Sequence, residues 1–500
     1  MRFDMFRNVS DVETRSRKIA LDAPVVLRID AALILIMAAV AAYYFIYPLW
    51  RSQFLIEIWR TEGWNAYFQD AAASGERIYP ATSAQIVNNY PPLSFYTIGL
   101  LGSAFGDNLF VGRVLSLISL VIISIEVFAC VRTLAGGVVG PALGALWFAA
   151  IMSHNFTSYV GANDPQLAGE AIMGFGLVWL LRRHKAGQAP LGPLLVMVVG
   201  GFWKHNMIAI PLTAVIWLFA RRGRRALAPV ALSALAAAAG LATCGGIFGA
   251  DFFRNLLTER DYSFGHILGN IGHLQWSAPT AMIWLSWVLN SRSLGAKFTS
   301  VHVPIALASC LLQWAGDATF GNVEFDWIIA LGIAIGVTCA SIETSVVARY
   351  IGPTWTRAVV VTLLALRLIA TDRQEPLLVL MDPQFKHSFE AGEQSVRKEA
   401  AQVASIDGNV YCDIKIGAGW LESLSPSMIS RSVKCSRQSA WIDPSWTSSL
   451  PCDVSLHSRT SRLAWEPSTH HWPTPFSGEK RLEHKYQVGI NDGEVADCCR

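Results

Sequence analysis

Charged side chains are scarce in this sequence. Asp, Glu, Lys and Arg make up 15% of the 500 residues, whereas 52% of the residues are hydrophobic. Soluble domains carry about 25% charged residues, so the composition excludes an ordinary soluble protein and indicates a polytopic membrane protein. The net charge of +3 says little by itself, because the placement of Lys and Arg matters more than their sum in such proteins. We expect membrane lipids and no nucleic acid among the partners.

The cysteines lack the spacing of a metal site. None of the nine forms a Cys-x-x-Cys motif or a Cys/His ligand set, so no zinc site is predicted. Four of them fall in apolar segments and are predicted to act as small hydrophobic residues. These are Cys130, Cys244, Cys310 and Cys339. A divalent metal ion is left open as a cofactor.

A signal-peptide cleavage site is also missing. Residues up to Arg28 are basic and polar, and the apolar run that follows contains no small-residue cleavage motif. This pattern excludes a removed signal peptide and predicts a retained first span.

Long apolar segments follow one another between residues 31 and 370. A bilayer core needs about 20 apolar residues per helix, and fewer if the span is buried among others. On this criterion the chain is an all-α integral membrane protein with about eleven transmembrane helices. The predicted spans are Ala31–Leu49, Leu109–Val131, Val138–Met152, Gln166–Leu181, Leu191–Trp203, Met207–Ala220, Leu227–Phe248, Pro279–Asn290, Val301–Trp314, Trp327–Val347 and Trp355–Ala370. Leu93–Phe105 is too short to cross, so we expect an interfacial or re-entrant helix there.

Basic residues occupy every second loop between these spans, as the positive-inside rule requires. They are Arg15, Arg17, Lys18, Arg132, Arg182, Arg183, Lys185, Arg221, Arg222, Arg224, Arg225, Arg292, Lys297, Arg349 and Arg357. The alternation predicts a multi-pass protein of the plasma (inner) membrane. Residues 1–30 form its cytoplasmic N-terminus, residues 31–370 its membrane domain, and the C-terminal part lies outside.

The alternate loops hold most of the residues that could carry chemistry. The stretch from Glu62 to Leu93 is too polar for lipid and ends in Asn88-Asn89-Tyr90-Pro91-Pro92, where two prolines fix the backbone. Later loops add acids, amides and cations, namely Asn155, Asn163, Asp164, Gln166, Lys204, His205, Asn206, Arg254, Arg260, His266, Asp317 and Glu324. Polar groups at membrane depth are costly and are usually kept for a site. We therefore predict a site on the extracytoplasmic face.

Several of these residues also have a simpler interpretation. Glu62 could cap the helix that follows it, and Asp164 before Pro165 has a common capping arrangement. Lys204 lies on the side that lacks other basic residues, which favours anion binding over snorkelling to lipid headgroups.

The remaining charged residues also have a structural interpretation beside a functional one. Arg260 could meet lipid phosphate instead of a substrate. Arg113, near the outer end of its span, could snorkel or reach the same anion as Lys204. Asp317 and Glu324 are interpreted as structural residues of a loop.

The order of these residues resembles that of a known family. An acid soon after the first span is followed by x-Pro-Pro-Leu, a short apolar segment ending in Phe-Gly, and an Arg that opens the next span. Here the order is Glu62, Tyr90-Pro91-Pro92-Leu93, Phe105-Gly106 and Arg113, with Asn163-Asp164-Pro165 and Lys204 also in place. Over roughly residues 30–370 the chain looks like the membrane glycosyltransferases of the GT-C fold, related to protein O-mannosyltransferases and the lipid A aminoarabinose transferase.

The resemblance implies a polyprenyl-phosphate sugar donor, transfer on the outer face, and Glu62 as the base. This sequence departs from many relatives just before Pro-Pro, where they have a basic residue and it has Tyr90. Lys204, His205 or Arg260 would then hold the donor phosphate.

The chemistry of such a transfer agrees with these residue types. Displacement at an anomeric carbon needs a base for the acceptor hydroxyl and cationic or N–H groups for the leaving phosphate. We hypothesise an inverting transfer of a hexosyl or pentosyl group to a hydroxyl of a lipid, glycan or protein. Glu62 would be the base, and Asp164 would position the acceptor or a metal ion. The predicted substrate-binding residues are Asn88, Asn89, Tyr90, Arg113, Lys204, His205 and Arg260.

Two rival functions stay open. Intramembrane acids and a Lys also mark transporters, and a non-catalytic lipid-handling protein could keep the same scaffold. The sequence has no inverted repeat and no matching pair of broken spans, which favours an enzyme at the interface.

The composition changes again near the C-terminus. Residues 371–412 are predicted to form an extracytoplasmic segment, the remnant of a small domain. Beyond residue 413 apolar periodicity vanishes, which is typical of a disordered tail. Codon degeneracy also permits an out-of-frame readthrough, because residues 417–431 read one base earlier can encode a more ordinary protein segment.

Overall fold

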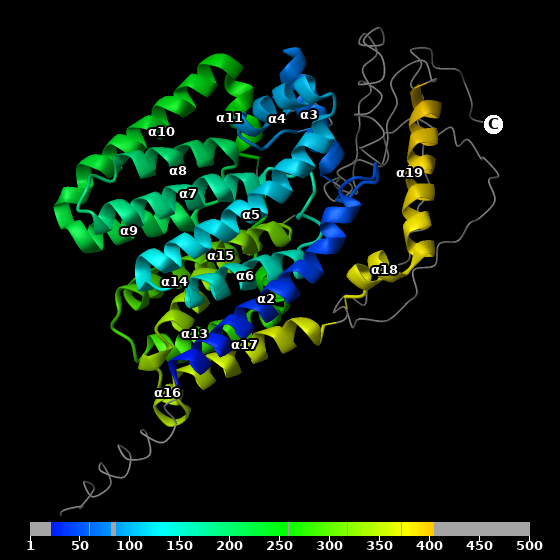
Figure 1. The fold of residues 1–500 in the computed structure, drawn as a ribbon. Coiled ribbons are helices and arrows are strands. Elements are labelled where there is room, and N and C mark those ends of the chain that lie inside the picture. The colour runs from blue at the N-terminus through cyan, green and yellow to red at the C-terminus, as the bar shows by residue number, and fades with distance from the viewer. Residues whose placement is uncertain are drawn as a thin grey trace, which may run out of the picture.

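The computed structural model describes residues 22–404, apart from residues 60, 82–86, 259, 318 and 372. Predictions for residues 1–21 and 405–500, including the tail beyond residue 413, lie outside the described residues. The regular elements of the described part are all helices (Figure 1). This confirms the predicted all-α class.

Six long helices form the middle of the molecule. They are α2 (Ala23–Arg51), α5 (Asn108–Ala135), α6 (Val139–Asn155), α7 (Gln166–Lys185), α14 (Leu294–Ala315) and α15 (Phe325–Ala340). The residues from Phe325 to Cys339 on α15 are all buried, because this helix is apolar on every side and is surrounded by the others. It packs most extensively on α6, with α5 and α14 also against it.

Glycines bring α6 and α15 into close contact. A Cβ atom at Gly144 would lie 2.5 Å from the carbonyl oxygen of Gly332, and one at Gly140 would lie 2.5 Å from that of Gly336. Small residues at a helix interface let two backbones approach closely inside a membrane. The central helix is therefore held by backbone packing that any larger residue would break.

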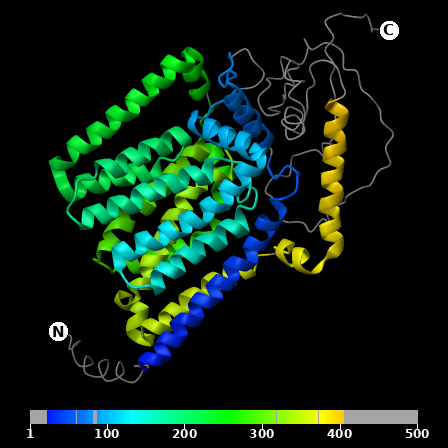
Figure 2. The same cartoon turned by 45° about the horizontal axis from the view of Figure 1, so that its top comes forward.

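A second layer covers one side of this core. Here α8 (Leu191–Trp203) lies between α7 and α10 (Leu227–Phe248), and α9 (Ala209–Arg222) packs on α7 and α14 (Figures 1 and 2). The remaining helices are α3 (Glu62–Ser74), α4 (Leu93–Phe105), α11 (Ala250–Leu256), α12 (Phe264–Asn270), α13 (Ala278–Val288), α16 (Val346–Ile351), α17 (Pro353–Ile369), α18 (Glu375–Met381) and α19 (Pro383–Ala404).

The last helix, α19, docks on the end of α2 through aromatic rings. Phe389 lies against Trp50 with ring centroids 4.8 Å apart, and against Tyr47 at 6.4 Å. The described part of the predicted segment 371–412 thus contains two helices, α18 and α19, and α19 stands beside the bundle in both views (Figures 1 and 2).

Every predicted span falls on a helix. Leu191–Trp203 and Leu227–Phe248 match α8 and α10 from end to end, and the short segment Leu93–Phe105 matches α4. The prediction for Trp327–Val347 was wrong at its C-terminal end, because α15 stops at Ala340 and α16 starts afresh after Ser345. The Ser345 side chain caps α16 by accepting from the Ala348 N–H.

Length and composition alone single out fewer spans. Within the described residues, five helical stretches are long and apolar enough to cross a membrane. They are Ala23–Arg51, Asn108–Ala135, Ala209–Phe248, Leu294–Ala315 and Gly321–Ala340. The chain is therefore a multi-pass membrane protein by its helices.

The two ends of the bundle carry different chemistry. Arg113 lies near the start of α5 and Arg132 near its end, about 28 Å apart at about 1.5 Å per residue. This span approaches the thickness of a bilayer hydrocarbon core, about 30 Å. The loops rich in acids and amides meet at the Arg113 end, and basic turns meet at the Arg132 end.

Hydrogen bonds join the basic turns to one another. Arg222 at the end of α9 donates to the carbonyl oxygen of Gln188 after α7. Arg357 on α17 forms an ion pair with Asp30 on α2. Within the described residues, the end of α9 therefore contacts the turn after α7, and α17 contacts α2.

Candidate active site

Glu62 opens α3 and is completely buried. Its Oε1 accepts from Arg113 Nε at 2.9 Å and from the Asn163 N–H at 2.7 Å. Its Oε2 accepts from Arg113 Nη2 at 2.8 Å and from the Ile58 N–H at 2.7 Å. Both oxygens are occupied by the protein itself, so Glu62 presents no surface to a substrate in this structure.

Arg113 is equally occupied. Besides Glu62, its guanidinium donates to the carbonyl oxygens of Ser52, Phe54 and Ile56 at 3.3, 2.5 and 2.7 Å. Its exposed fraction is 2%. The prediction that Arg113 binds substrate is not supported, because all three nitrogens of its guanidinium donate to groups between Ser52 and Glu62.

Three side chains on one face of α3 hydrogen-bond to the loop before α7, and we call this set of contacts the clamp. Asn65 donates to the Asn163 carbonyl oxygen at 2.7 Å, and Gln69 exchanges two side-chain hydrogen bonds with Asn163 at 2.8 and 2.9 Å. Together with the bond from its N–H to Glu62, all polar groups of Asn163 are satisfied. Asn163 also sits against Gly112, where a Cβ atom would lie 1.9 Å from its Oδ1.

These contacts were not predicted from the sequence, although the spacing of the three residues indicates them. Glu62, Asn65 and Gln69 are spaced three and four residues apart, which places them on one helix face. The consequence is local rigidity, because the residue before Asp164 is fixed at every polar atom.

Asp164 is the acid that this clamp positions. Its Oδ1 accepts from the Gln166 N–H at 2.8 Å and from Lys204 Nζ at 3.1 Å. The first bond closes a turn onto the N–H of the first residue of α7, although the N-cap position itself is Pro165 and not Asp164. Its Oδ2 accepts no hydrogen bond from the described residues, and the side chain is 5% exposed. Asp164 therefore offers one unoccupied oxygen at the edge of the buried network.

Lys204 follows α8 directly and points at Asp164. Its side chain is 1% exposed, and its ammonium lies 4.5 Å from the centre of the Tyr90 ring. Burial alone would lower the pKa of Lys204, but the charge of Asp164 and the contact with Tyr90 outweigh it, so the pKa is raised. The group is a cation at neutral pH, and it is the buried cation of the site.

Tyr90 occupies the position where relatives have a basic residue. Its ring packs edge-on against Trp64 at 5.0 Å and stacks on Phe95 at 6.3 Å. Its backbone carbonyl accepts from the Tyr79 hydroxyl at 2.9 Å. Tyr90 lacks the positive charge that relatives have at this position. Its ring packs against the ammonium of Lys204, which supplies a positive charge from the end of α8.

His205 and Arg260 stand on the wall of the same region. The His205 side chain is exposed to solvent on one side. The protein that surrounds its other sides, and then the charges of Lys204 and Arg260, lower the pKa of His205 to about 4. It is therefore neutral at physiological pH and can donate or accept a hydrogen bond. Arg260 is exposed, with one contact from its Nη1 to the Asp317 carbonyl oxygen at 3.5 Å.

The two asparagines before Tyr90 differ. Asn88 is fully buried, donates to the Ile78 carbonyl oxygen at 3.0 Å and accepts from the Tyr90 N–H at 3.0 Å. It shapes the loop, so the prediction that it binds substrate is not supported. Asn89 is half-buried and no side-chain hydrogen bond forms to it among the described residues, which leaves it available.

The donor set around Asp164 does not suit a divalent ion. No group of three or more His, Cys, Asp or Glu side chains that could hold a metal ion occurs in the described part of the chain. Asp164 already has the Lys204 ammonium on its Oδ1, and this cation would repel a metal ion beside it.

Comparisons with known proteins bear on the fold. No family model and no curated protein matches the sequence. A crystal structure from Cupriavidus metallidurans, bound to undecaprenyl phosphate, superposes with a TM-score of 0.51 over 78% of this chain and 85% of its own. The chain shares the fold of ArnT. The identity to that ArnT structure is 14%, and the apo ArnT structure gives a TM-score of 0.50 at 15% identity over 81% and 89% of the two chains.

ArnT is the lipid A aminoarabinose transferase. The match confirms the GT-C-like architecture that the sequence resemblance implied. At this level of identity the likeness concerns the arrangement of the helices, and the residues around Asp164 have to carry any statement about the reaction.

Proposed function

We propose that this protein transfers a sugar from a polyprenyl-phosphate donor to an acceptor hydroxyl, with inversion at the anomeric carbon. The observation that carries the proposal is the Asp164–Lys204 pair, 3.1 Å apart, with a free carboxylate oxygen. The ArnT structure, which shares this fold, contains undecaprenyl phosphate. A carboxylate and a buried ammonium on one side of a membrane bundle are the groups that such a transfer needs.

Lys204 is proposed to receive the leaving group. When the anomeric C–O bond breaks, its electron pair stays on the phosphate of the polyprenyl chain, which gains negative charge. A phosphate that reaches Lys204 competes with Asp164 for the ammonium. Arg260 and the neutral His205 lie on the adjoining wall and can hold the outer phosphate oxygens.

Asp164 is proposed as the base in place of Glu62. A base must accept the proton of the acceptor hydroxyl as the new C–O bond forms, so it needs an oxygen without a partner. Asp164 has one, whereas both oxygens of Glu62 are bonded to Arg113 and to backbone N–H groups. Once the donor phosphate draws Lys204 away, the carboxylate of Asp164 also loses the cation that stabilises its charge. Glu62 is then a positioning residue, acting through Asn163.

The topology belongs to the same proposal. About eleven crossings account for the helices described here, with the shorter ones buried among the longer. The basic turns gather at the end opposite Asp164, so the positive-inside rule places them in the cytoplasm and the site on the extracytoplasmic face. The acceptor, whether lipid, glycan or protein, would approach from that face.

The two rival functions, a transporter and a lipid-handling protein, would place or use the polar groups differently. A transporter places its polar groups near the middle of the membrane, whereas Asp164 and Lys204 lie at helix ends. A lipid-handling protein would bind the donor and release no sugar. A labelled polyprenyl-phosphate sugar separates these outcomes, because only the enzyme transfers the label to an acceptor.

Replacing Lys204 by Met should weaken the use of the donor. We expect kcat/KM for the polyprenyl-phosphate sugar to fall about 10- to 100-fold, because one charge-assisted hydrogen bond to phosphate is lost. Lys204→Arg should recover part of it. The measurement is initial rate against donor concentration in purified, reconstituted protein.

The matched control is Arg254→Met. Arg254 also forms an ion pair with an aspartate, Asp251, but its side chain is 63% exposed and it lies on α11. An unchanged kcat/KM for the Lys204→Met variant, or an equal loss in the control, would remove Lys204 from the donor site.

A further inference from the structure

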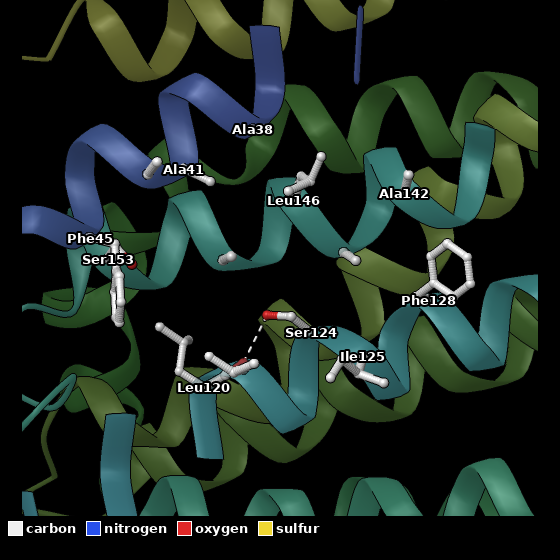
Figure 3. A pocket seen from close by; sticks show the side chains of 14 residues that line it. Ala38, Ala41, Phe45, Leu120, Ser124, Ile125, Phe128, Ala142, Leu146 and Ser153 are labelled. Carbon is white, nitrogen blue, oxygen red and sulfur yellow. Dashed lines mark hydrogen bonds between the residues drawn. The ribbon is translucent and has the colours of Figure 1, made fainter. Parts of the chain in front are cut away.

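An apolar groove runs along the outside of the bundle between α2, α5 and α6. It has a volume of about 500 Å³ and is lined by Ala38, Ala41, Ala42, Phe45, Leu120, Val121, Ser124, Ile125, Phe128, Ala142, Ala145, Leu146, Ala149 and Ser153. Figure 3 shows alanines of α2 and α6 on one side and longer apolar side chains of α5 on the other. The Ser124 hydroxyl is already bonded to the Leu120 carbonyl oxygen at 2.8 Å (Figure 3). The walls thus suit a hydrocarbon chain.

A second cavity adjoins this groove at its basic end. It has a volume of about 560 Å³ and shares Ile125 and Phe128 with the groove. Its polar lining comes from Arg132 and Thr133 on α5 and from Arg182 and Lys185 at the end of α7. Three cations therefore stand at the mouth of an apolar channel.

These three cations differ from their basic neighbours. Arg183 donates to the Ala189 carbonyl oxygen at 3.1 Å, and Arg222 donates to that of Gln188. Arg132, Arg182 and Lys185 form no side-chain hydrogen bond, ion pair or ring contact within the described residues. Three like charges around one cavity repel one another unless an anion joins them.

We propose that the two cavities together bind one anionic phospholipid of the cytoplasmic leaflet. The phosphate of the headgroup lies among Arg132, Arg182 and Lys185, and an acyl chain lies in the apolar groove. Basic pockets between transmembrane helices on the cytoplasmic side are suited to such headgroups. A neutral lipid would leave the cations unpaired, and a water-soluble anion would leave the groove empty.

The sugar donor does not fit this place. Arg132 lies about 28 Å along α5 from Arg113, which is linked through Glu62 to Asn163, the residue before Asp164. A phosphate held by Arg132 could not reach Lys204. The lipid site is thus separate from the proposed reaction, and it can be present whether or not the sugar-transfer proposal holds.

The headgroup is tested by native mass spectrometry of the full chain released from nanodiscs that contain phosphatidylglycerol or phosphatidylcholine. We expect wild type to retain one phosphatidylglycerol and little phosphatidylcholine. The triple variant Arg132→Gln, Arg182→Gln, Lys185→Gln should lose about tenfold or more of that affinity. The matched control removes three exposed cations that line neither cavity, with Arg224→Gln, Arg225→Gln and Arg292→Gln, and should retain the lipid.

The groove is tested by filling it. Ala142→Leu with Ala149→Leu places two larger side chains in its wall and should also reduce retention, whereas Ala238→Leu on the exposed face of α10 should not. Equal retention of both lipids, or equal losses in variants and controls, would overturn the proposal. Displacement of the lipid by inorganic phosphate alone would also overturn it, because the acyl chain in the groove would then contribute nothing to binding.

Discussion

Asp164→Asn is expected to lower sugar transfer per folded molecule by orders of magnitude while donor binding persists, and also to lower stability, because the buried Lys204 loses its partner. The substitution removes the negative charge and the basicity of the carboxylate that contacts Lys204 through Oδ1 and has no hydrogen bond on Oδ2. Loss of a base costs about 10²- to 10⁴-fold in rate. The Asn side chain can still accept from the Gln166 N–H, so the start of α7 should survive. The measurement is kcat with labelled donor, beside the affinity for polyprenyl phosphate.

A capping aspartate elsewhere provides the control for Asp164. Asp107 is half-buried and caps α5 by accepting from the Phe110 N–H at 3.1 Å, so Asp107→Asn should leave kcat nearly unchanged. If Asp164→Asn turned over at more than about a tenth of the wild-type rate, Asp164 would be a cap and not a base.

Glu62→Gln is expected to act mainly on stability. Removing one partner of a buried ion pair costs about 3–5 kcal/mol, because Arg113 would be left as an uncompensated charge at 2% exposure. The free energy of unfolding should fall by an amount of this order. The measurement is reversible chemical unfolding in detergent, or the thermal midpoint where unfolding is irreversible.

A double variant separates the structural role of Glu62 from a catalytic one. Glu62→Gln with Arg113→Met removes both charges, so its loss of stability should be smaller than the sum of the single losses by about 0.5–3 kcal/mol. Turnover per folded molecule should fall less in Glu62→Gln than in Asp164→Asn. A Glu62→Gln protein of wild-type stability but without turnover would restore Glu62 as the base and refute our assignment.

The fold could be predicted from the sequence because each membrane helix is indicated by its own run of apolar residues. Leu191–Trp203 and Leu227–Phe248 are bounded by polar or turn-forming residues, and a run of apolar residues in lipid has to be helical to satisfy its backbone. The alternation of basic loops also predicted that Glu62 and Lys204 lie at the same end of the bundle, as their contacts with Asn163 and Asp164 require. The predicted end at Val347 was wrong, because a serine cap interrupts an otherwise apolar run after Ala340. The helices α2 and α14 also begin earlier than predicted, at Ala23 and Leu294.

The roles within the site were less accessible, since they depend on partners that are distant in sequence. Arg113 is 51 residues from Glu62, and nothing near either residue indicates that they neutralise each other. The same holds for Tyr90 and Lys204, which meet only through folding. The residue types at the site were predictable, but which carboxylate is buried in a pair and which keeps a free oxygen was not.

The most direct measurement is a structure of the full chain with a polyprenyl-phosphate sugar, or a stable analogue, bound in lipid. Our account predicts the phosphate within hydrogen-bond distance of Lys204 Nζ and the anomeric carbon beside Asp164 Oδ2. The Asp164–Lys204 contact should be lengthened, while the pair between Glu62 and Arg113 is unchanged. A phosphate bound elsewhere with the Asp164–Lys204 pair intact, or a sugar in contact with Glu62, would contradict it.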